Sequence, residues 1–466
     1  MGVVSGAVVH GAPPPQHDVI ANLWEWNWPS IARECATVLG PDGYGGVQVA
    51  PPEDSYAIPG HQWYDVYQPA DYNLTSRMGN EAQFKDMVTA CRNAGVKVYV
   101  DAVINHMAGE DGTSYGGTVY TKYNYPGLYT AADFHHYPAD CPEQDGTVHN
   151  FNDYTEVTKC ELDGLADLRT ESDHVRDTIA GYLNKLIGYG VSGFRVDAAK
   201  HIGETDLASI ESRLHTTLDG TPPYLALEVA LGSTGDLAPA AFEPEGSLLG
   251  FDYATTLTKA FLARIASLRF LNEQGGLLPS NKELVFVQNH DNERDGSTLN
   301  YKSGRVNILA TEFMLAWPYG TAEVYSSFAW TNSDDPPPSD ANGFVTNTDC
   351  SHGWTCIDRK SGVVHMVAWH NEVAGTPVAN WYSDHNNLIA FSRGTVGWIT
   401  VNNGSKAKTG TFSTGLPQGT YCDILHGTFK NGKCSGRTVK VDAHRKAKVT
   451  VPKQDAIAFT TADRVH

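Results

Sequence analysis

Short apolar runs alternate with helical patterns along the first part of the chain. Apolar residues dominate segments 19–23, 46–52 and 96–101, which predicts three strands. Between the second and third strands, segment 81–94 repeats apolar residues at helical spacing, and Gly95 follows its end. Strands that alternate with helices favour a parallel sheet built from βαβ units.

A carboxylate stands at the end of each of three later apolar runs. Asp197 closes the run that begins at Gly193, Glu228 follows the run that begins at Tyr224, and Asp291 ends segment 284–291. The first two acids are 31 residues apart and the last two are 63 residues apart. A (β/α)8 barrel of roughly 250 residues uses about 31 residues for each strand–helix unit, and its active site lies at the carboxyl ends of the strands. The spacing therefore predicts three acids on one rim of a barrel.

Acids that converge on one cleft are what glycoside hydrolysis requires. One carboxylate attacks or stabilises the sugar carbon, and another protonates the leaving oxygen. Arg195 is expected on the same side of its strand as Asp197, where its charge would keep Asp197 ionised, although it could also form a plain structural ion pair. A single acid at a strand end is most often a helix N-cap or a surface residue, but three acids at barrel spacing favour a shared site.

The third and fourth strands are too far apart for one barrel unit. Asp101 and Asp197 are separated by 96 residues, so about 60 residues exceed the barrel repeat. The surplus is rich in Gly, Tyr, Asp and His, and a structureless loop of that length is uncommon in a compact protein. We expect residues 107–169 to form a loop-rich subdomain inserted on the active-site face.

The pattern changes again near the C-terminus. One more barrel strand fits around residues 321–325, and beyond Pro377 short alternating strands are separated by Gly and Asn turns. These strands are expected at 388–391, 398–401, 420–424, 439–441 and 447–451. The predicted fold is an α/β (β/α)8 TIM barrel over residues 1–106 and 170–377, the inserted subdomain over 107–169, and a C-terminal antiparallel β-sandwich over 378–466.

Composition limits the partners. The 466 residues carry a formal net charge of −19, which argues against nucleic acid or an anionic membrane surface as a partner. The sequence has no apolar run long enough to span a bilayer. The first ~17 residues have neither a basic segment nor a sustained apolar core, so we expect a flexible Gly/Pro-rich lead-in rather than a signal peptide. We expect a monomer.

The eight cysteines form an even set without the C-x2-C spacing of zinc or redox sites. Three pairs close local loops, namely 141/160, 350/356 and 422/434, and Cys35 with Cys91 is left as a long-range fourth pair. Disulfides persist in oxidising compartments, so we expect a secreted, extracellular protein.

Four segments resemble the signature motifs of the α-amylase family of glycoside hydrolases, in the family's order. They are Asp101–His106, Gly193–His201, Glu228–Val229 and Phe286–Asp291. The similarity extends through Trp63–Pro69 and Cys160–Asp167 and covers nearly the whole chain, which most resembles the secreted actinobacterial and animal-type branch. The resemblance implies retaining endo-hydrolysis of internal α-1,4-glucosidic bonds in starch, glycogen and maltooligosaccharides.

The resemblance also implies roles for individual residues. Asp197 would be the nucleophile, Glu228 the general acid/base, and Asp291 the acid that binds hydroxyls of the distorted sugar. For Tyr64 and Gln68 the role in the site is favoured, with ordinary packing as the alternative. The implied substrate-binding residues are Arg195, His106, His290, Trp63, Tyr64, Tyr67, Gln68, Lys200, His201, Leu162 and Leu165. Of these, the Lys200-His201 pair favours starch over sucrose or isomaltose.

The resemblance further implies a structural calcium ion. Its ligands would be the side chains of Asn105 and Asp167 and the backbone carbonyls of Thr158 and His201, all hard oxygens. The alternative is that Asn105 and Asp167 only form turns. Animal-type members also bind an activating chloride through residues matching Arg195, Asn289 and a basic residue on strand eight, but here that last position is Glu323. We therefore doubt chloride dependence.

Two other functions remain open on the sequence. An exo-acting maltooligosaccharide-forming amylase or an α-glucan transglycosylase would share the catalytic residues. A catalytically inactive glucan-binding relative is disfavoured, because such proteins typically lose one of the three acids and this chain keeps all three.

Overall fold

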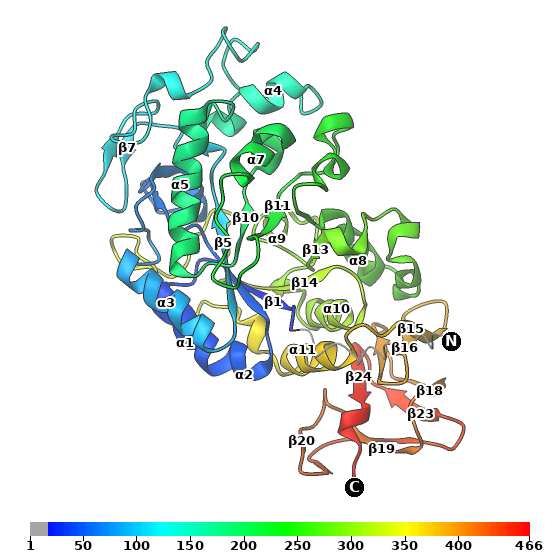
Figure 1. Ribbon diagram of the computed structural model, residues 1–466. Coiled ribbons are helices and arrows are strands. Elements are labelled where there is room, and N and C mark those ends of the chain that lie inside the picture. The colour runs from blue at the N-terminus through cyan, green and yellow to red at the C-terminus, as the bar shows by residue number, and fades with distance from the viewer. Residues whose placement is uncertain (1–16) are drawn as a thin grey trace, which may run out of the picture.

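The computed structural model describes residues 17–466, and all but the end of the predicted lead-in lies outside the described residues. Eight parallel strands close into a barrel with helices around it (Figure 1). In chain order the strands are β1 (Ile20–Leu23), β2 (Gly46–Val49), β5 (Lys97–Ala102), β10 (Gly193–Val196), β11 (Tyr224–Leu227), β12 (Ser247–Leu249), β13 (Glu283–Val285) and β14 (Thr321–Ser326). The predicted barrel is confirmed.

The helices cover the outside of the barrel. They include α1 (Trp28–Glu34), α3 (Glu81–Asn93), α5 (Asp173–Tyr189), α7 (Glu204–Glu211), α8 (Phe251–Leu262), α10 (Arg305–Ala316) and α11 (Ser361–Val373). The predicted helix over 81–94 is α3, which Asn80 caps at its N-terminus and which buries Phe84, Met87, Val88 and Cys91. Within residues 17–466, no helix is both long and apolar enough to cross a membrane.

One barrel strand was not predicted from the sequence. Strand β12 is only three residues long, and it lies within the double-length interval between Glu228 and Asp291. A three-residue strand is too short to show a period-2 pattern, so the spacing predicted room for it but the residues did not mark it.

The residues inserted after β5 contain little regular structure. The short strands β6 (His106–Met107) and β9 (Ala166–Asp167) pair at the two ends of the insertion, and β7 (Gly112–Thr113) pairs with β8 (Val119–Tyr120) within it. Helix α4 (Tyr154–Lys159) and the 3₁₀ turn η4 (Leu162–Gly164) precede β9. Pairing of β6 with β9 returns the chain to the point where it left the barrel.

The C-terminal residues form two four-stranded antiparallel sheets. One contains β15 (Val378–Ser383), β16 (Leu388–Arg393), β17 (Gly397–Asn402) and β24 (Asp455–Thr460); the other contains β18 (Lys408–Ser413), β23 (Lys446–Val451), β22 (Thr438–Val441) and β19 (Gly419–Cys422). On β16, Ile389 and Phe391 join the barrel core, whereas Leu388 and Ala390 pack in the core between the two sheets. The strands β16, β17 and β24 of the first sheet are therefore buried on both faces and join the sandwich to the barrel, whereas the edge strand β15 is partly exposed.

All four predicted disulfides are present: Cys35–Cys91, Cys141–Cys160, Cys350–Cys356 and Cys422–Cys434. The first joins α3 to the π-helical segment η1 (Cys35–Leu39), which continues α1. Each pair links segments that lie against each other in the folded chain, so the cysteines reinforce contacts that packing already makes.

Candidate active site

The three acids predicted to share a rim do meet in one cavity at the carboxyl ends of the strands. Asp197 follows β10, Glu228 follows β11, and Asp291 lies beyond β13. All three line a cavity of about 460 Å3. The backbone N–H of Asp197 donates to the carbonyl of Ala102, and that of Glu228 donates to the carbonyl of Val196. The barrel's own hydrogen bonds therefore fix the two strand ends that carry these acids.

A sharp turn after Asp197 places a further donor beside Glu228. Ala198 has φ of 46°, in the left-handed region that residues with a side chain rarely adopt. Its N–H donates to Oε2 of Glu228 at 2.8 Å. The turn therefore connects Asp197 to Glu228 through one backbone hydrogen bond. Because alanine rarely adopts a left-handed conformation, the sequence does not predict this turn.

Arg195 lies at the centre of the acids. Its Nη1 is 2.8 Å from Oδ1 of Asp101 and 2.7 Å from Oδ1 of Asp197, and its Nη2 is 3.0 Å from Oε2 of Glu228. The side chain of Arg195 is only 2% exposed. One buried guanidinium thus contacts three carboxylates, and two of them are the proposed nucleophile and acid/base.

Burial and charge act against each other at Asp197. Burial raises the pKa of Asp197 well above its ordinary value, and the positive charge of Arg195 lowers it. The effect of Arg195 has the sign that the sequence predicted. However, burial is the larger influence, so the net shift of the pKa is upward rather than downward.

Asp101 is a functional residue that the sequence analysis did not place in the site. It is buried at the end of β5, where its Oδ1 contacts Arg195 and its Oδ2 accepts a hydrogen bond from the Tyr67 hydroxyl at 2.8 Å. A strand-end acid at this position was visible in the sequence. The long insertion hid its relation to the other acids, because 96 residues, about three barrel repeats, separate Asp101 from Asp197 although their strands are direct neighbours.

Aromatic residues form one wall of the cavity. Trp63, Tyr64 and Tyr67 all line it and come from the 3₁₀ segment η2 (Trp63–Tyr67) after β2. Gln68, next in the chain, also lines the cavity, and its Oε1 accepts a hydrogen bond from the N–H of Gly109 at 3.2 Å. Gln68 therefore touches the inserted segment as well as the cleft.

Two predicted histidines line the same cavity. His290 stacks on Trp24, at 5.0 Å between ring centroids, and on Tyr67, at 5.1 Å. Burial lowers the pKa of His290 well below its ordinary value and that of His106 to about 4. Both rings are therefore neutral near pH 7. The Nε2 of His106 donates to the carbonyl of Tyr67 at 3.1 Å, so the ring of His106 is held by the segment that carries the aromatic wall.

The inserted segment supplies the opposite side of the cavity. Leu162 and Leu165 line it as predicted, together with Asp163, which the sequence analysis did not select. Asp163 has φ of 52° within η4. An Asp tolerates the left-handed region better than most residues, which gave a weak sequence signal for a turn here but none for a site.

Lys200 and His201 do not line this cavity, although both were predicted to contact substrate. They belong to the short helix α6 (Ala199–Ile202) and are buried. Lys200 Nζ donates to the carbonyl of Ala230, and His201 Nδ1 donates to the carbonyl of Val157. In this structure the two residues join the loop after β11 and helix α4 to the rim of the barrel.

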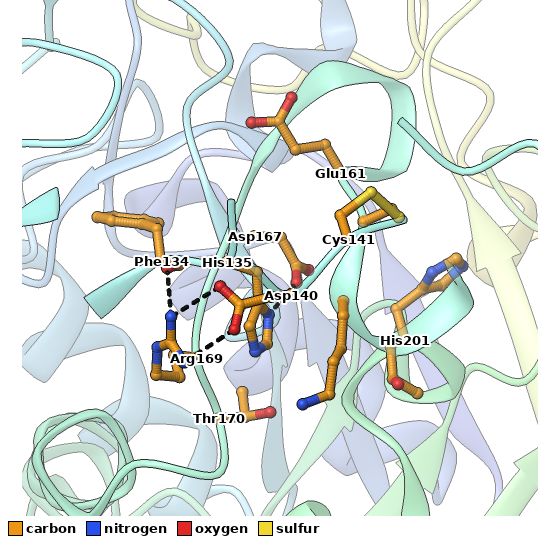
Figure 2. A network of polar contacts seen from close by, with 12 residues as sticks. Phe134, His135, Asp140, Cys141, Glu161, Asp167, Arg169, Thr170 and His201 are labelled. Atoms are coloured by element: carbon orange, nitrogen blue, oxygen red, sulfur yellow. Dashed lines mark hydrogen bonds and ion pairs between the residues drawn. A yellow bond between two sulfur atoms is a disulfide. The ribbon is translucent and has the colours of Figure 1, made fainter. Parts of the chain in front are cut away.

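Two of the residues predicted to bind calcium, Asn105 and Asp167, lie side by side where the insertion joins the barrel, and Figure 2 shows the surroundings of Asp167. Asn105 and Asp167 are both buried, and Nδ2 of Asn105 is 3.4 Å from Oδ1 of Asp167. The other carboxylate oxygen of Asp167 is 2.7 Å from Nδ1 of His135. The ring of His201 bonds the carbonyl of Val157, the residue before Thr158, so the side chain of His201 lies against the end of α4 that carries Thr158.

The chemistry of this set suits calcium. One carboxylate, one amide oxygen and two carbonyl oxygens are hard donors of the kind that Ca2+ takes, with water filling further positions. Residues 17–466 contain no group of three or more His, Cys, Asp or Glu in a metal-binding arrangement.

Glu323 lies on β14, the eighth barrel strand, as the sequence predicted. Its side chain is buried, and its Oε1 accepts a hydrogen bond from Nδ2 of Asn22 at 3.0 Å. Burial raises the pKa of Glu323 to about 7, while Arg195 lowers it. An acid rather than a base therefore lies beneath the site on this strand.

Comparisons with known proteins agree with this geometry. The family model described as "Alpha amylase, catalytic domain" matches residues 50–221, and the model described as "Alpha amylase, C-terminal all-beta domain" matches residues 380–462. The α-amylase of Thermomonospora curvata is 44% identical over 98% of this chain and 75% of its own length. That of the beetle Tenebrio molitor is 39% identical over 93% of this chain and 94% of its own length.

A solved structure gives the same result. The crystal structure of a mutant α-amylase I from the earthworm Eisenia fetida, in a complex with maltohexaose, superposes with a TM-score of 0.93 at 35% identity. The match covers 97% of this chain and 98% of the earthworm chain. With its acids at the carboxyl ends of a (β/α)8 barrel and relatives that match it over nearly its whole length, the chain belongs to the α-amylase family and is a hydrolase of that family.

Proposed function

We propose that this protein hydrolyses internal α-1,4-glucosidic bonds in starch, glycogen and maltooligosaccharides with retention of the anomeric configuration. The observation that carries the proposal is the contact of Asp197 and Glu228 with neighbouring nitrogens of the Arg195 guanidinium. Two carboxylates bound to one guanidinium lie close together. Retaining glycosidases need nucleophile and acid about 5–5.5 Å apart, whereas inverting enzymes need room for a water molecule between substrate and base.

The reaction then takes two displacements. Asp197 attacks the anomeric carbon while Glu228 gives a proton to the glycosidic oxygen, so that the carbon–oxygen bond breaks and a glycosyl ester of Asp197 forms. Water next attacks the same carbon, Glu228 takes the proton from that water, and Asp197 leaves as a carboxylate. The side chains of Asp197 and Glu228 are 11% and 19% exposed, so each acid is open to the cleft yet largely shielded from bulk water.

The remaining residues of the cavity bind and orient the substrate. Asp291 and the neutral His290 would bond sugar hydroxyls at the cleavage position, and Trp63 and Tyr67 would stack on glucose rings. Leu162 and Leu165 would bound the opposite side of the glucan chain. The maltohexaose in the earthworm structure supports a substrate of several glucose units. Lys200 and His201 would contact the chain only if it extended beyond the cavity described above.

Calcium would be held by Asn105, Thr158, Asp167 and His201. It would contribute positive charge that bridges the inserted segment and the barrel, and it would take no part in bond breaking. Four disulfides support an extracellular location. The formal net charge of −19 supports a neutral polymer as the partner rather than nucleic acid or an anionic membrane.

A timed digest of soluble starch tests the proposal. Endo-action gives a rapid loss of iodine staining with long intermediates before short products accumulate, whereas exo-action releases one short product from the start. The anomer released first, read by NMR before mutarotation, must be α.

Glu228→Gln tests the assignment of the acid. The amide has no proton to give to the leaving oxygen, so kcat should fall at least ~10²-fold while the circular dichroism spectrum is unchanged. Glu211→Gln, at a carboxyl on α7 outside the cavity, is the matched control and should keep wild-type activity. Retention of more than a tenth of the wild-type rate by Glu228→Gln would overturn the assignment.

A further inference from the structure

Arg294 lies one helical turn beyond Asp291 but has no role in the steps above. It belongs to the short helix α9 (Asn292–Asp295), and its backbone N–H donates to the carbonyl of Asp291 at 3.0 Å. Its side chain is only 4% exposed. A fully charged guanidinium is rarely buried without a specific set of partners, so its surroundings need an explanation.

Four aromatic rings surround this guanidinium. The distance from its Cζ to the ring centroid is 5.0 Å for Trp24, 5.2 Å for Trp63, 5.2 Å for Phe328 and 5.4 Å for Trp330. Each distance lies within the range in which a cation is attracted to an aromatic ring. Contacts with four rings at once fix the orientation of the Arg294 plane and of the rings together.

Hydrogen bonds join the same group to the cleft. Arg294 Nε donates to the carbonyl of Ser333 at 3.1 Å, and Trp63 Nε1 donates to that same carbonyl at 2.8 Å. Arg294 Nη1 donates to the carbonyl of His290 at 3.1 Å. The Arg294 side chain therefore contacts the ring of Trp63, the Ser333 carbonyl that accepts a hydrogen bond from Trp63, and the backbone of His290.

These contacts reach the ends of four adjacent barrel strands. Trp24 follows β1, Trp63 follows β2, His290 follows β13, and the loop with Phe328, Trp330 and Ser333 follows β14. In the closed barrel these strands are neighbours in the order β2, β1, β14, β13. A backbone hydrogen bond from the N–H of Trp24 to the carbonyl of Ser326 ends the ladder between β1 and β14, so beyond the strand ends side chains help to set the relative positions of the loops.

Two buried acids lie near Arg294. Glu293 forms an ion pair with Arg294 and accepts a hydrogen bond from the Tyr325 hydroxyl at 3.0 Å. Glu25, which has no hydrogen-bond partner among the described residues, lies near enough for Arg294 to lower its pKa, although burial raises the pKa of Glu25 to about 8. A neutral residue in place of Arg294 would remove the ion pair with Glu293, and lysine would keep the charge but lose the planar group that stacks.

We propose that Arg294 is a positioning residue for glucan binding. It holds Trp63, on which a glucose ring would stack, and the segment of His290 in fixed positions relative to each other across the ends of four strands. The inference rests on the proposed function, because it concerns the wall on which glucose rings would stack. Arg294 bonds the Ser333 carbonyl that also accepts from Trp63, and it packs on Trp24, which stacks on His290. Loss of Arg294 would therefore loosen both Trp63 and His290. Misplacement of positioning groups by about 1 Å can cost 10²-fold in rate.

The test uses Arg294→Lys and Arg294→Met with steady-state kinetics on soluble starch, well below each variant's melting temperature. We expect kcat/KM to fall ~10-fold or more in both variants, with a rise in KM as platform contacts are lost. If Arg294→Met does not fold, Arg294→Lys alone decides. Lys302→Met is the control, because Lys302 Nζ also lies over Trp330, at 3.0 Å from its centroid, but Lys302 is exposed and outside the cleft. It should stay within twofold of wild type.

A double-mutant cycle separates positioning from general destabilisation. If Arg294 acts through Trp63, then Trp63→Ala combined with Arg294→Lys should lose little more kcat/KM than the worse single variant. Losses that multiply, or a kcat/KM within twofold of wild type for Arg294→Lys, would overturn the proposal. The near-UV circular dichroism of Arg294→Lys, compared with Trp63→Ala, reports the ring positions without activity. A wild-type protein inactive on starch would refute the proposed function, and an unchanged near-UV spectrum would refute this inference separately.

Discussion

Replacement of Arg195 by methionine should lower the unfolding free energy of the protein by an amount that depends on pH, and should change the pH dependence of catalysis. Arg195 contacts Asp101, Asp197 and Glu228 at 2.7 to 3.0 Å while almost fully buried. By Coulomb's law each contact at these distances is worth about 6 kcal/mol at an effective dielectric constant near 20, but burial of the guanidinium opposes this by several kcal/mol. Deletion of one partner of a buried ion pair typically costs about 3–5 kcal/mol of unfolding free energy.

The sign of the pH dependence follows from the carboxyl groups that remain. Burial already raises the pKa of Asp101 and Asp197 in the folded protein, and loss of Arg195 removes the charge that lowers them. A carboxyl whose pKa is higher when folded than when unfolded stabilises the fold below the unfolded value and loses that contribution as pH rises through the folded value. The destabilisation of Arg195→Met should therefore be greater at pH 8 than at pH 5.

The same shift predicts a kinetic change. A higher pKa for Asp197 leaves the nucleophile protonated over more of the pH range, so the acid limb of kcat/KM should move to higher pH. Denaturant unfolding at pH 5 and pH 8, together with a pH–rate profile, measures both effects. Arg213→Met is the control, because Arg213 pairs with the largely exposed Asp173 and Asp177 and should change stability by less than about 1 kcal/mol. Equal destabilisation at the two pH values, or an unmoved acid limb, would refute the reasoning.

Three further predictions follow from the same contacts. Removal of calcium by a chelator should lower the melting temperature of the wild type, because loss of a ligand that binds only the folded state destabilises it. The same treatment should leave the melting temperature of Asn105→Ala unchanged, and an equal decrease in both proteins would contradict the proposed site. Hydrolysis of starch should proceed at the same rate in chloride-free acetate as with added chloride at fixed ionic strength, because Arg195 already faces three carboxylates and Glu323 adds an acid; saturable several-fold activation would show otherwise. Burial raises the pKa of Glu53 from 4.5 to about 8, so its contribution, roughly 5 kcal/mol, should be lost as pH rises toward 8, and the melting temperature of Glu53→Gln should depend less on pH between 5 and 8 than that of wild type.

The sequence by itself determined the barrel, the insertion and the positions of the acids along the chain. Strand-end carboxylates at multiples of the barrel repeat predicted that Asp197, Glu228 and Asp291 share a rim. In a (β/α)8 barrel each strand–helix unit adds one strand to the ring, so residues spaced by whole units end at the same rim. The cysteine spacings likewise predicted all four disulfides. These features depend on local pattern and regular repeats, which a single sequence records.

Only the tertiary structure decided which side chains meet across the rim. Asp101 joins Arg195 because β5 and β10 are neighbours, although 96 residues separate Asp101 from Asp197. Arg294 meets Trp24, Trp63 and the loop after β14 because closure of the barrel brings those loops together. The left-handed turn at Ala198, and the burial that outweighs Arg195 at Asp197, are likewise consequences of packing. Contacts between loops and the free energy of burial depend on the whole assembled fold, and no local stretch of sequence contains them.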